Sequence, residues 1–269
     1  MAIDIAKLKI PAVSPDGLKA LELISRPDPD IKQLERTILL DPILASTLIK
    51  YANSPLYRRA NKITNVPGAI RVLGLRNIRS AVVMATMRAL ARPEAEANRA
   101  IWGHSIDISM LCKLIARETA PEMADDMEFI GLIHDLGLLV LANTFPARYN
   151  EFLRQARLEN TAIDELELGE FGQQHDMIVR HVLEKFRIPD EYIVLLSGFH
   201  THEPLGPERG GANLQLAILD LAHHLWLGAL PRSAQIPETI VETVESLQQR
   251  LGIADDFMER VFEEFSARK

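Results

Sequence analysis

The sequence predicts an all-helical protein, and three observations lead to this prediction. Alanine, leucine, isoleucine, glutamate and arginine dominate the composition, a set that favours helix over sheet. Aromatic residues make up only 6% of the 269 residues, and strand-like alternation of polar and apolar side chains is hard to find. The hydrophobic fraction is 47%, which is enough for such helices to bury a core without disulfides.

The first third of the chain has the signals of several short helices. Asp41-Pro42 supplies an N-cap and a first-turn proline for one helix, and Asn53-Ser54-Pro55 ends it. Thr64 or Asn65 caps the next apolar run. Gly74 interrupts that run, and we expect a tight turn between two helices there. These residues predict a small N-terminal helical bundle.

Residues 91–98 show the clearest change in composition, with a proline, small residues and charges between two apolar helices. We place a subdomain boundary there, which divides the chain into residues 1–95 and 96–269. The second part should contain helices around residues 100–119, 127–143, 146–159, 161–169, 173–187, 189–199, 213–229 and 237–265. Prolines 121 and 189 and the loop 200–211 separate several of them.

Two histidines lie on helix faces that should point into the core. His104 shares a stripe with Ile108, Leu111 and Ile115, because these residues follow at helical spacing. His175 shares a second stripe with Val179, Val182 and Phe186. An inward-facing histidine is more often a hydrogen-bonded core residue than a metal ligand. The stripes alone therefore identify no metal site.

Two buried acids give a stronger indication of chemistry. His134 and Asp135 are adjacent in the apolar run 129–141, and Asp220 is the only acid in the apolar run 214–230. Burying a carboxylate beside an imidazole is costly without partners. Either a metal ion or a hydrogen-bond network of protein groups can compensate them, and the residues leave both possibilities open.

The order His104, His134-Asp135, Asp220 resembles the H…HD…D ligand pattern of the HD superfamily of metal-dependent phosphohydrolases. The flanking sequence is similar to one branch, the HDOD family, from about residue 10 to residue 230. Matching segments include Leu40-Asp41-Pro42-Ile43-Leu44, Tyr51-Ala52-Asn53-Ser54, Phe171-Gly172 with His175, and Phe186-Arg187-Ile188-Pro189.

This resemblance implies a two-part all-α structure, in which an N-terminal helical bundle packs against an HD-like helical domain used in bacterial signal transduction. It also implies that His104, His134, Asp135 and Asp220 bind a divalent metal such as iron, manganese or zinc. His175 and His202 are weaker candidates, as ligands of a second metal or as acid-base groups.

The sequence departs from the catalytic members of the superfamily at two places. Enzymes that hydrolyse cyclic dinucleotides usually have a lysine in the motif His-Asp-x-Gly-Lys, and here that position is Leu138. Their paired histidines and Gly-Tyr-Pro loop are also missing, with Thr201 in place of the first histidine. We therefore expect a regulatory module that acts through protein or ligand binding and whose metal site is structural or vestigial. Metal-dependent hydrolysis of a phosphomonoester or nucleotide is the alternative.

The charge of the chain is strongly polarised. The formal net charge is −7, but nine basic residues and no acid lie between residues 42 and 93, which leaves 21 basic against 37 acidic residues, or −16, elsewhere. Such polarity steers anionic partners, unless the basic part docks on the acidic part of the same chain. Binding of a signalling protein or a small anionic ligand is expected at Arg58, Arg59, Lys62, Arg71, Arg76 and Arg79. Nucleic acid is disfavoured, because the whole protein is acidic.

The remaining sequence features favour a cytoplasmic location. Cys112 is the only cysteine, which excludes an internal disulfide and a multi-cysteine zinc site. The N-terminus has no apolar core of signal-peptide length, and His134 and Asp135 interrupt the longest apolar stretch. We expect neither export nor a membrane-spanning segment.

Overall fold

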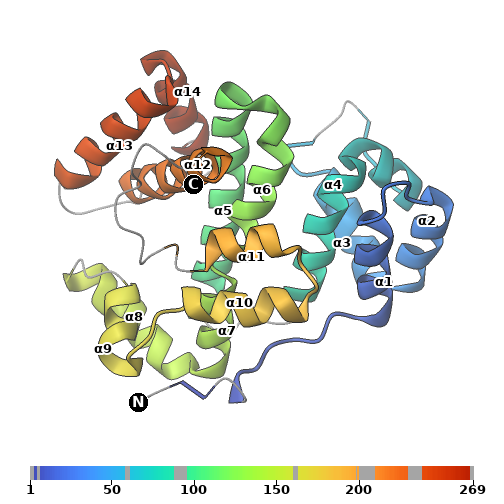
Figure 1. Cartoon of the computed structure of the whole chain (residues 1–269), viewed down its shortest axis with the longest axis horizontal. Coiled ribbons are helices and arrows are strands. Elements are labelled where there is room, and N and C mark those ends of the chain that lie inside the picture. Colours follow the sequence, from blue (N-terminus) through green and yellow to red (C-terminus); the bar gives the residue numbers. More distant parts are fainter. Residues whose placement is uncertain are drawn as a thin grey trace. The chain divides into compact units, whose positions relative to one another are not determined.

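The computed structural model describes residues 3–4, 7–57, 61–87, 96–159, 163–197, 199, 210–229 and 238–266. Every regular element within these residues is a helix (Figure 1), which confirms the all-helical prediction. The chain forms two compact units: unit 1 consists of Met1–Trp102 and His134–His200, and unit 2 of Gly103–Ile133 and Thr201–Lys269. The subdomain boundary predicted at residues 91–98 falls mainly in 88–95, outside the described residues, and stays a prediction.

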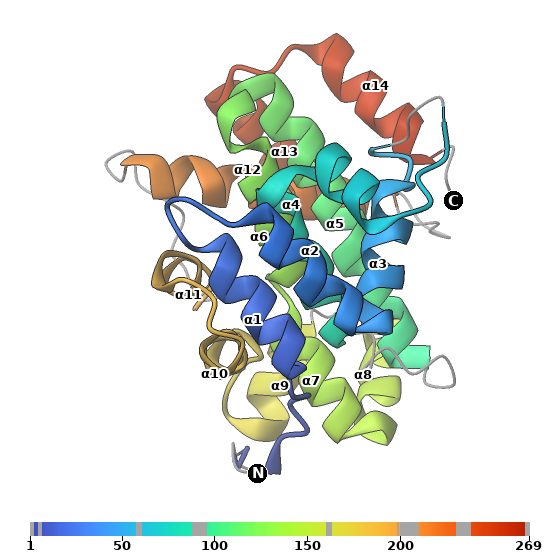
Figure 2. The same cartoon turned by 90° about the vertical axis from the view of Figure 1, so that its right-hand side faces the viewer.

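Unit 1 begins with a bundle of four helices, in which each helix contacts the next and the first also contacts the last (Figures 1 and 2). They are α1 (Pro15–Ile24), α2 (Ile31–Leu40), α3 (Pro42–Ala52) and α4 (Val66–Met87). Fully buried aliphatic residues such as Leu34, Ile38 and Leu48 form their core. Gly74 has a φ of 73° and kinks α4, so the turn expected at this glycine is confirmed.

Two helix caps in this bundle are joined by one hydrogen bond. Asp41 caps α3 as predicted, since its Oδ1 accepts from the backbone N–H of Ile43 and Leu44 at 2.9 and 3.0 Å. Ser14 caps α1 by accepting from Gly17, and its hydroxyl donates to Asp41 Oδ2 at 2.7 Å. Burial raises the pKa of Asp41, but these hydrogen bonds outweigh it and hold the pKa below the usual range. The beginnings of α1 and α3 are thereby tied together.

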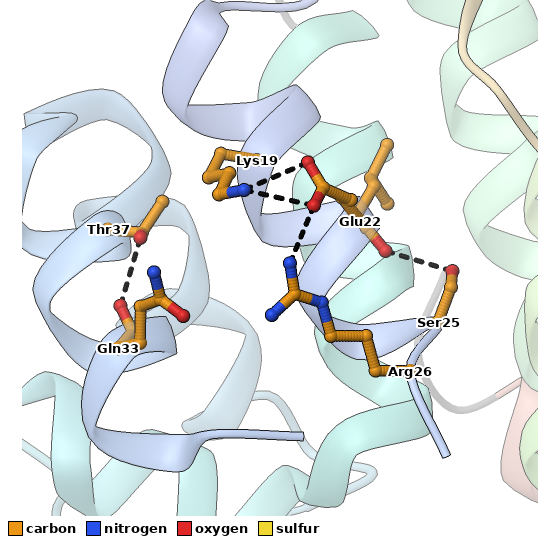
Figure 3. Close-up of polar contacts among 7 residues, drawn as sticks. Lys19, Glu22, Ser25, Arg26, Gln33 and Thr37 are labelled. Atoms are coloured by element: carbon orange, nitrogen blue, oxygen red, sulfur yellow. Dashed lines mark hydrogen bonds and ion pairs between the residues drawn. The ribbon is translucent and has the colours of Figure 1, made fainter. Parts of the chain in front are cut away.

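Polar side-chain contacts of α1 and α2 remain local. Glu22 accepts from Lys19 at 2.9 and 3.0 Å and from Arg26 at 2.8 Å, all within α1 and its end (Figure 3). The hydroxyl of Thr37 donates to the carbonyl of Gln33 within α2 (Figure 3). Exposed ion pairs such as those of Glu22 add little stability, so the apolar interior holds the bundle together.

The rest of unit 1 has a short apolar helix, α7 (Leu136–Thr144), packed between two others. This helix contacts α8 (Pro146–Glu159) and α10 (Asp176–Lys185), α8 contacts α9 (Ile163–Phe171), and α10 contacts α11 (Asp190–Leu196). The helix predicted at 127–143 is wrong in one respect. The structure divides it into α6 (Ala124–Ile133) and α7, because the chain leaves helical geometry at the His134-Asp135 pair.

Unit 2 is built around α12 (Gly210–Ala229), which contacts α6, α13 (Glu238–Leu251) and α14 (Asp255–Ser266). It also holds the η2 turn (Pro121–Met123) and most of α5 (Glu96–Thr119). The single helix predicted at 237–265 is in fact two, because Gly252 adopts a φ of 65° between α13 and α14. Figure 1 shows α13 and α14 beside α12.

One apolar stretch of the described chain, Pro121–Thr144, has the length and composition of a membrane span. Within the fold, 94% of that stretch's most apolar window is buried. Such burial is typical of core helices, and the stretch consists of η2, α6 and α7.

Candidate metal centre

His134 and Asp135 occupy the junction between α6 and α7. Their side chains are buried, at 2% and 3% exposure, and His134 Nε2 lies 3.2 Å from Asp135 Oδ1. Asp135 stands at the N-cap of α7, yet its carboxylate makes no capping hydrogen bond to that helix. The carboxylate is therefore directed to other groups, in agreement with the expectation that this buried pair needs compensation.

His175 is a second histidine that meets Asp135 inside unit 1. Its Nε2 lies 3.4 Å from Asp135 Oδ1, and its Nδ1 lies 2.7 Å from Glu167 Oε2. The backbone N–H of His175 donates to the same Glu167 oxygen at 2.8 Å. Tyr149 donates its hydroxyl to the other oxygen, Glu167 Oε1, at 2.6 Å. We call Asp135, His175, Glu167 and Tyr149 the Asp135 network.

Sequence analysis found two members of the Asp135 network and missed the others. His175 was predicted to face inward, and it is buried. Glu167 and Tyr149 are fully buried as well. Their helices carry many polar residues, so the sequence pattern did not predict this burial. The available signal was the need of a buried histidine for a partner, and Glu167 lies only eight residues away.

The electrostatics of the Asp135 network favour a charged imidazole. Burial alone lowers the pKa of His175, but the charges of Glu167 and Asp135 and their hydrogen bonds outweigh it and raise the pKa well above its usual value. Burial, together with Glu167, raises the pKa of Tyr149, so its hydroxyl stays protonated as a donor.

Gly137 allows α7 to reach this network. A Cβ at this position would lie 2.0 Å from the carbonyl oxygen of His175 and 3.1 Å from the backbone nitrogen of Val179. Both are backbone atoms at the start of α10 and cannot move aside cheaply. The glycine two residues after Asp135 is therefore required for the close approach of His175.

Unit 2 contributes a separate group of rings around His104. His104 lies on α5 with Ile108, Leu111 and Ile115, all buried, which confirms the predicted stripe. Its ring centroid is 4.8 Å from that of His223 and 4.3 Å from that of Trp226, both on α12. Trp226 Nε1 donates to Asp107 Oδ2 at 3.0 Å, which holds the indole against His104.

Asp220, the predicted fourth ligand, has a local partner. Its Oδ1 lies 3.1 Å from His224 Nδ1, and its side chain is 37% exposed, so the prediction that this carboxylate is buried is wrong. Its role as a ligand stays a prediction, as does that of His202, which lies outside the described residues. His223 was not among the predicted ligands, although it follows Asp220 by one turn in the same apolar run.

The donor chemistry of these residues fits a divalent metal. His134 offers an imidazole and Asp135 a carboxylate, and His104 and His223 offer two further imidazoles. Mixed nitrogen and oxygen donors of this kind suit zinc, iron or manganese. His134 and Asp135 belong to unit 1, and His104 and His223 belong to unit 2.

The predicted anion-binding residues differ in their exposure and contacts. Lys62, Arg71 and Arg76 are exposed on the N-terminal bundle. Arg79 is half-buried and donates to the hydroxyl of Tyr192 at 2.7 Å, with its guanidinium 5.3 Å from that ring. Arg58 and Arg59 lie outside the described residues. Arg79 therefore contributes to packing against α11.

An all-helical fold with a buried His-Asp pair at the junction of two core helices defines an HD-like helical module. The sequence model of the HDOD domain family matches residues 10–202, which is more than half of the chain. The chain belongs to the HDOD family. This assignment confirms the resemblance recognised in the sequence.

The chain is also similar to several known proteins. An HDOD domain protein with unknown function from Geobacter sulfurreducens is 21% identical, with a TM-score of 0.71 over 98% of this chain and 91% of that one. The MmoQ response regulator (fragment 20–298) from Methylococcus capsulatus str. Bath is 25% identical, with a TM-score of 0.50 over 95% and 97%. The uncharacterized protein YuxH from Bacillus subtilis is 28% identical over 112 residues, which is 42% of this chain but only 27% of that protein.

Proposed function

We propose that this HDOD protein is a regulatory module that acts by binding a partner, with a structural metal ion bound at His134 and Asp135. His104 and Asp220 are the further ligands that the sequence predicts, and His223 is an additional candidate. When bound, the metal would supply positive charge to the buried Asp135 carboxylate. Metal binding would stabilise the native state by mass action.

The observation that carries this proposal is the composition of α7. From Leu136 to Thr144 this helix holds no charged residue, and Leu138 is buried where related hydrolases have a lysine. Hydrolysis of a phosphate ester needs cationic groups that neutralise the charge developing on the phosphoryl oxygens. A site next to α7 would receive no such group from this helix, which favours a binding role over turnover.

The first experiment is metal analysis with an activity assay on the same preparation. Protein purified without chelators or nickel resin is analysed by inductively coupled plasma mass spectrometry, beside Asp135→Ala, His223→Ala and Asp220→Ala. We expect near-stoichiometric metal in the wild type and loss in Asp135→Ala, and the metal contents of His223→Ala and Asp220→Ala decide which of these two residues is a ligand. Assays with p-nitrophenyl phosphate and bis-p-nitrophenyl phosphate should give no turnover.

Other outcomes have definite meanings. Phosphate release that disappears in folded Asp135→Ala would establish the alternative, a metal-dependent phosphohydrolase. A folded wild type without metal would make the polar residues a vestigial site. Metal retained in His223→Ala but lost in Asp220→Ala would identify Asp220 as the ligand, and the reverse result would identify His223.

For the partner, we propose an acidic signalling protein or a small anionic ligand in the cytoplasm, bound at the exposed cations of the N-terminal bundle. The named role of the MmoQ relative as a response regulator supports a place in signalling. Arg71→Glu with Arg76→Glu should weaken binding of fluorescent polyglutamate at low salt and leave the metal content unchanged. The control Arg250→Glu with Arg260→Glu makes the same charge change on exposed residues of unit 2. Equal loss in both variants would refute a specific surface.

A further inference from the structure

Three large apolar side chains are exposed where α2 ends and α3 begins, two helices that contact each other in the N-terminal bundle (Figure 2). Leu39, Leu40 and Ile43 are 58%, 71% and 59% exposed, and we call them the corner patch. Asp41, which lies between them in the chain, is directed to Ser14 and to the cap of α3. Single exposed apolar residues are ordinary, but three within five consecutive residues are typical of an interaction site.

The corner patch has a basic border. Arg36 precedes Leu40 by one helical turn and Lys32 precedes Arg36 by another, so these exposed residues form one strip along α2. Lys50 is exposed on α3, a helix that contains no acid. Glu35 is the one acid of α2, and it is half-buried. The surface around the corner patch is therefore positively charged.

α13 has an exposed face of the opposite charge. Glu238, Glu242 and Glu245 are exposed and follow one another at helical spacing, so they share this face. Val241 lies among them and is 42% exposed. Arg250, the one cation of α13, lies more than a turn beyond Glu245. The α13 face is thus an apolar side chain surrounded by acids, and the corner patch is a group of apolar side chains bordered by cations.

The charges of both surfaces remain available for a partner. In the described part of the chain, none of these three cations and three glutamates is in an ion pair. Glu22 shows the contrast, because Lys19 and Arg26 neutralise it locally on α1. Exposed surfaces of opposite charge attract each other, most strongly at low ionic strength.

We propose that the corner patch of one copy of this chain docks on the α13 face of a second copy. Helix-on-helix packing is the contact available to these surfaces, since no strand occurs among the described residues. Arg36 and Leu40 are one turn apart on α2, and Glu245 and Val241 are one turn apart in the opposite direction on α13. Antiparallel packing of the two helices therefore brings Glu245 to Arg36 and Val241 to Leu40.

A contact of this kind is heterologous, because the two surfaces differ. Each copy in a pair still has one surface to offer to a further copy, so association gives closed rings or open chains. No residue of the candidate metal centre belongs to either surface. The inference therefore stands apart from the proposed function and holds with or without metal.

Sedimentation equilibrium of the full chain at low salt tests the inference. The average mass of the wild type should rise with concentration, and salt should reverse the rise. The patch variant, Leu40→Ser with Ile43→Ser, removes the apolar contact, and the face variant, Glu242→Lys with Glu245→Lys, places like charges opposite each other. Each should weaken association by about tenfold or more.

A matched control removes two other exposed apolar side chains. Leu168 and Met177 are 54% and 55% exposed, so Leu168→Ser with Met177→Ser makes the same chemical change away from both surfaces. This control should associate as the wild type does. All the substituted residues are exposed, so melting temperatures should stay close to that of the wild type and show that each variant is folded.

Mixing the patch variant with the face variant tests the head-to-tail arrangement. Each variant has lost one surface and retains the other, so an equimolar mixture should form pairs and no larger species. A reversed charge pair tests the register. Arg36→Glu and Glu245→Lys should each weaken association alone, and a chain that carries both changes should recover it.

Three results would overturn the inference. A wild type that stays monomeric at high concentration and low salt has no such contact. Association that survives in the face variant but not in the patch variant would mean that the corner patch binds itself. Equal weakening in the control would mean unspecific apolar association. In contrast, a wild type that associates but contains no metal would refute the structural metal and leave this inference intact.

Discussion

Gly137 and His175 are in close backbone contact in the candidate site: a Cβ on Gly137 would lie 2.0 Å from the His175 carbonyl oxygen. This relationship explains why a glycine follows the His-Asp pair. The glycine lets α10 begin against α7, and only then can the His175 ring meet Asp135 and Glu167. A residue without a side chain thus determines the surroundings of the candidate metal ligand.

Replacing Gly137 by alanine should therefore destabilise the protein. The added methyl group meets backbone that cannot give way, and overpacking of this kind costs about 1–3 kcal/mol or more. Gly169→Ala is the matched control, because Gly169 lies inside α9 with no heavy atom within 4 Å of an added Cβ. That control should gain up to about 1 kcal/mol from helix propensity. Urea unfolding measures both, and a Gly137→Ala variant as stable as the wild type would contradict the close approach.

Removing Lys113 should be among the most damaging single changes in unit 2. Its ammonium group is 2% exposed and lies 2.6 Å from Glu128 Oε2 and 2.8 Å from Asp125 Oδ1. Lys113→Met would leave the buried Glu128 carboxylate without this cation, at a cost of about 3–5 kcal/mol. The double variant Lys113→Met with Glu128→Leu should recover much of the loss in thermal unfolding. Arg154→Met, which breaks an exposed pair with Glu151, should have almost no effect. Equal losses in the two single variants would show that burial is not the cause.

The thiol of Cys112 should be unreactive in the folded protein. Burial raises its pKa far above the usual value, and the side chain is fully buried in α5. Because the thiolate is the reactive form, Ellman's reagent at pH 8 should label native protein only as fast as the protein unfolds. In denaturant, one equivalent should react at once. Rapid labelling of native protein would mean that the surroundings of Cys112 open without global unfolding.

The Ser14–Asp41 link predicts a pH dependence of stability. Because hydrogen bonds lower the pKa of folded Asp41 below the unfolded value of 3.8, the ionised carboxylate stabilises the fold at pH above 3.8. This contribution is lost as the pH falls from 3.8 through the lower folded pKa. Asp41→Ala should cost about 1–2 kcal/mol at pH 7, as for other N-caps. Its difference from the wild type in denaturant unfolding should narrow below pH 3.8. A constant difference over that range would argue against stabilisation by the ionised form.

Local sequence signals predicted much of the fold and part of the site. Asp41-Pro42, Gly74 and the stripe that carries His104 depend on residues within one or two helical turns, and all three are confirmed. The His-Asp pair was recognised as the chemical centre because two polar residues interrupt an apolar run. The same local reasoning joined α6 to α7 and α13 to α14, because hydrophobic pattern alone does not show where a chain bends.

By itself, the sequence determined the helical class, the family and the buried His134-Asp135 pair that needs compensating partners. Composition, helix capping and the free-energy cost of burying polar groups can all be judged from residues close together in the chain. Only the tertiary structure decided which groups compensate them. The contact of Asp135 with His175 and that of His104 with His223 join residues far apart in the chain. Such contacts arise from the packing of one helix on another. The close approach at Gly137 is one of the contacts that determine how α10 packs on α7.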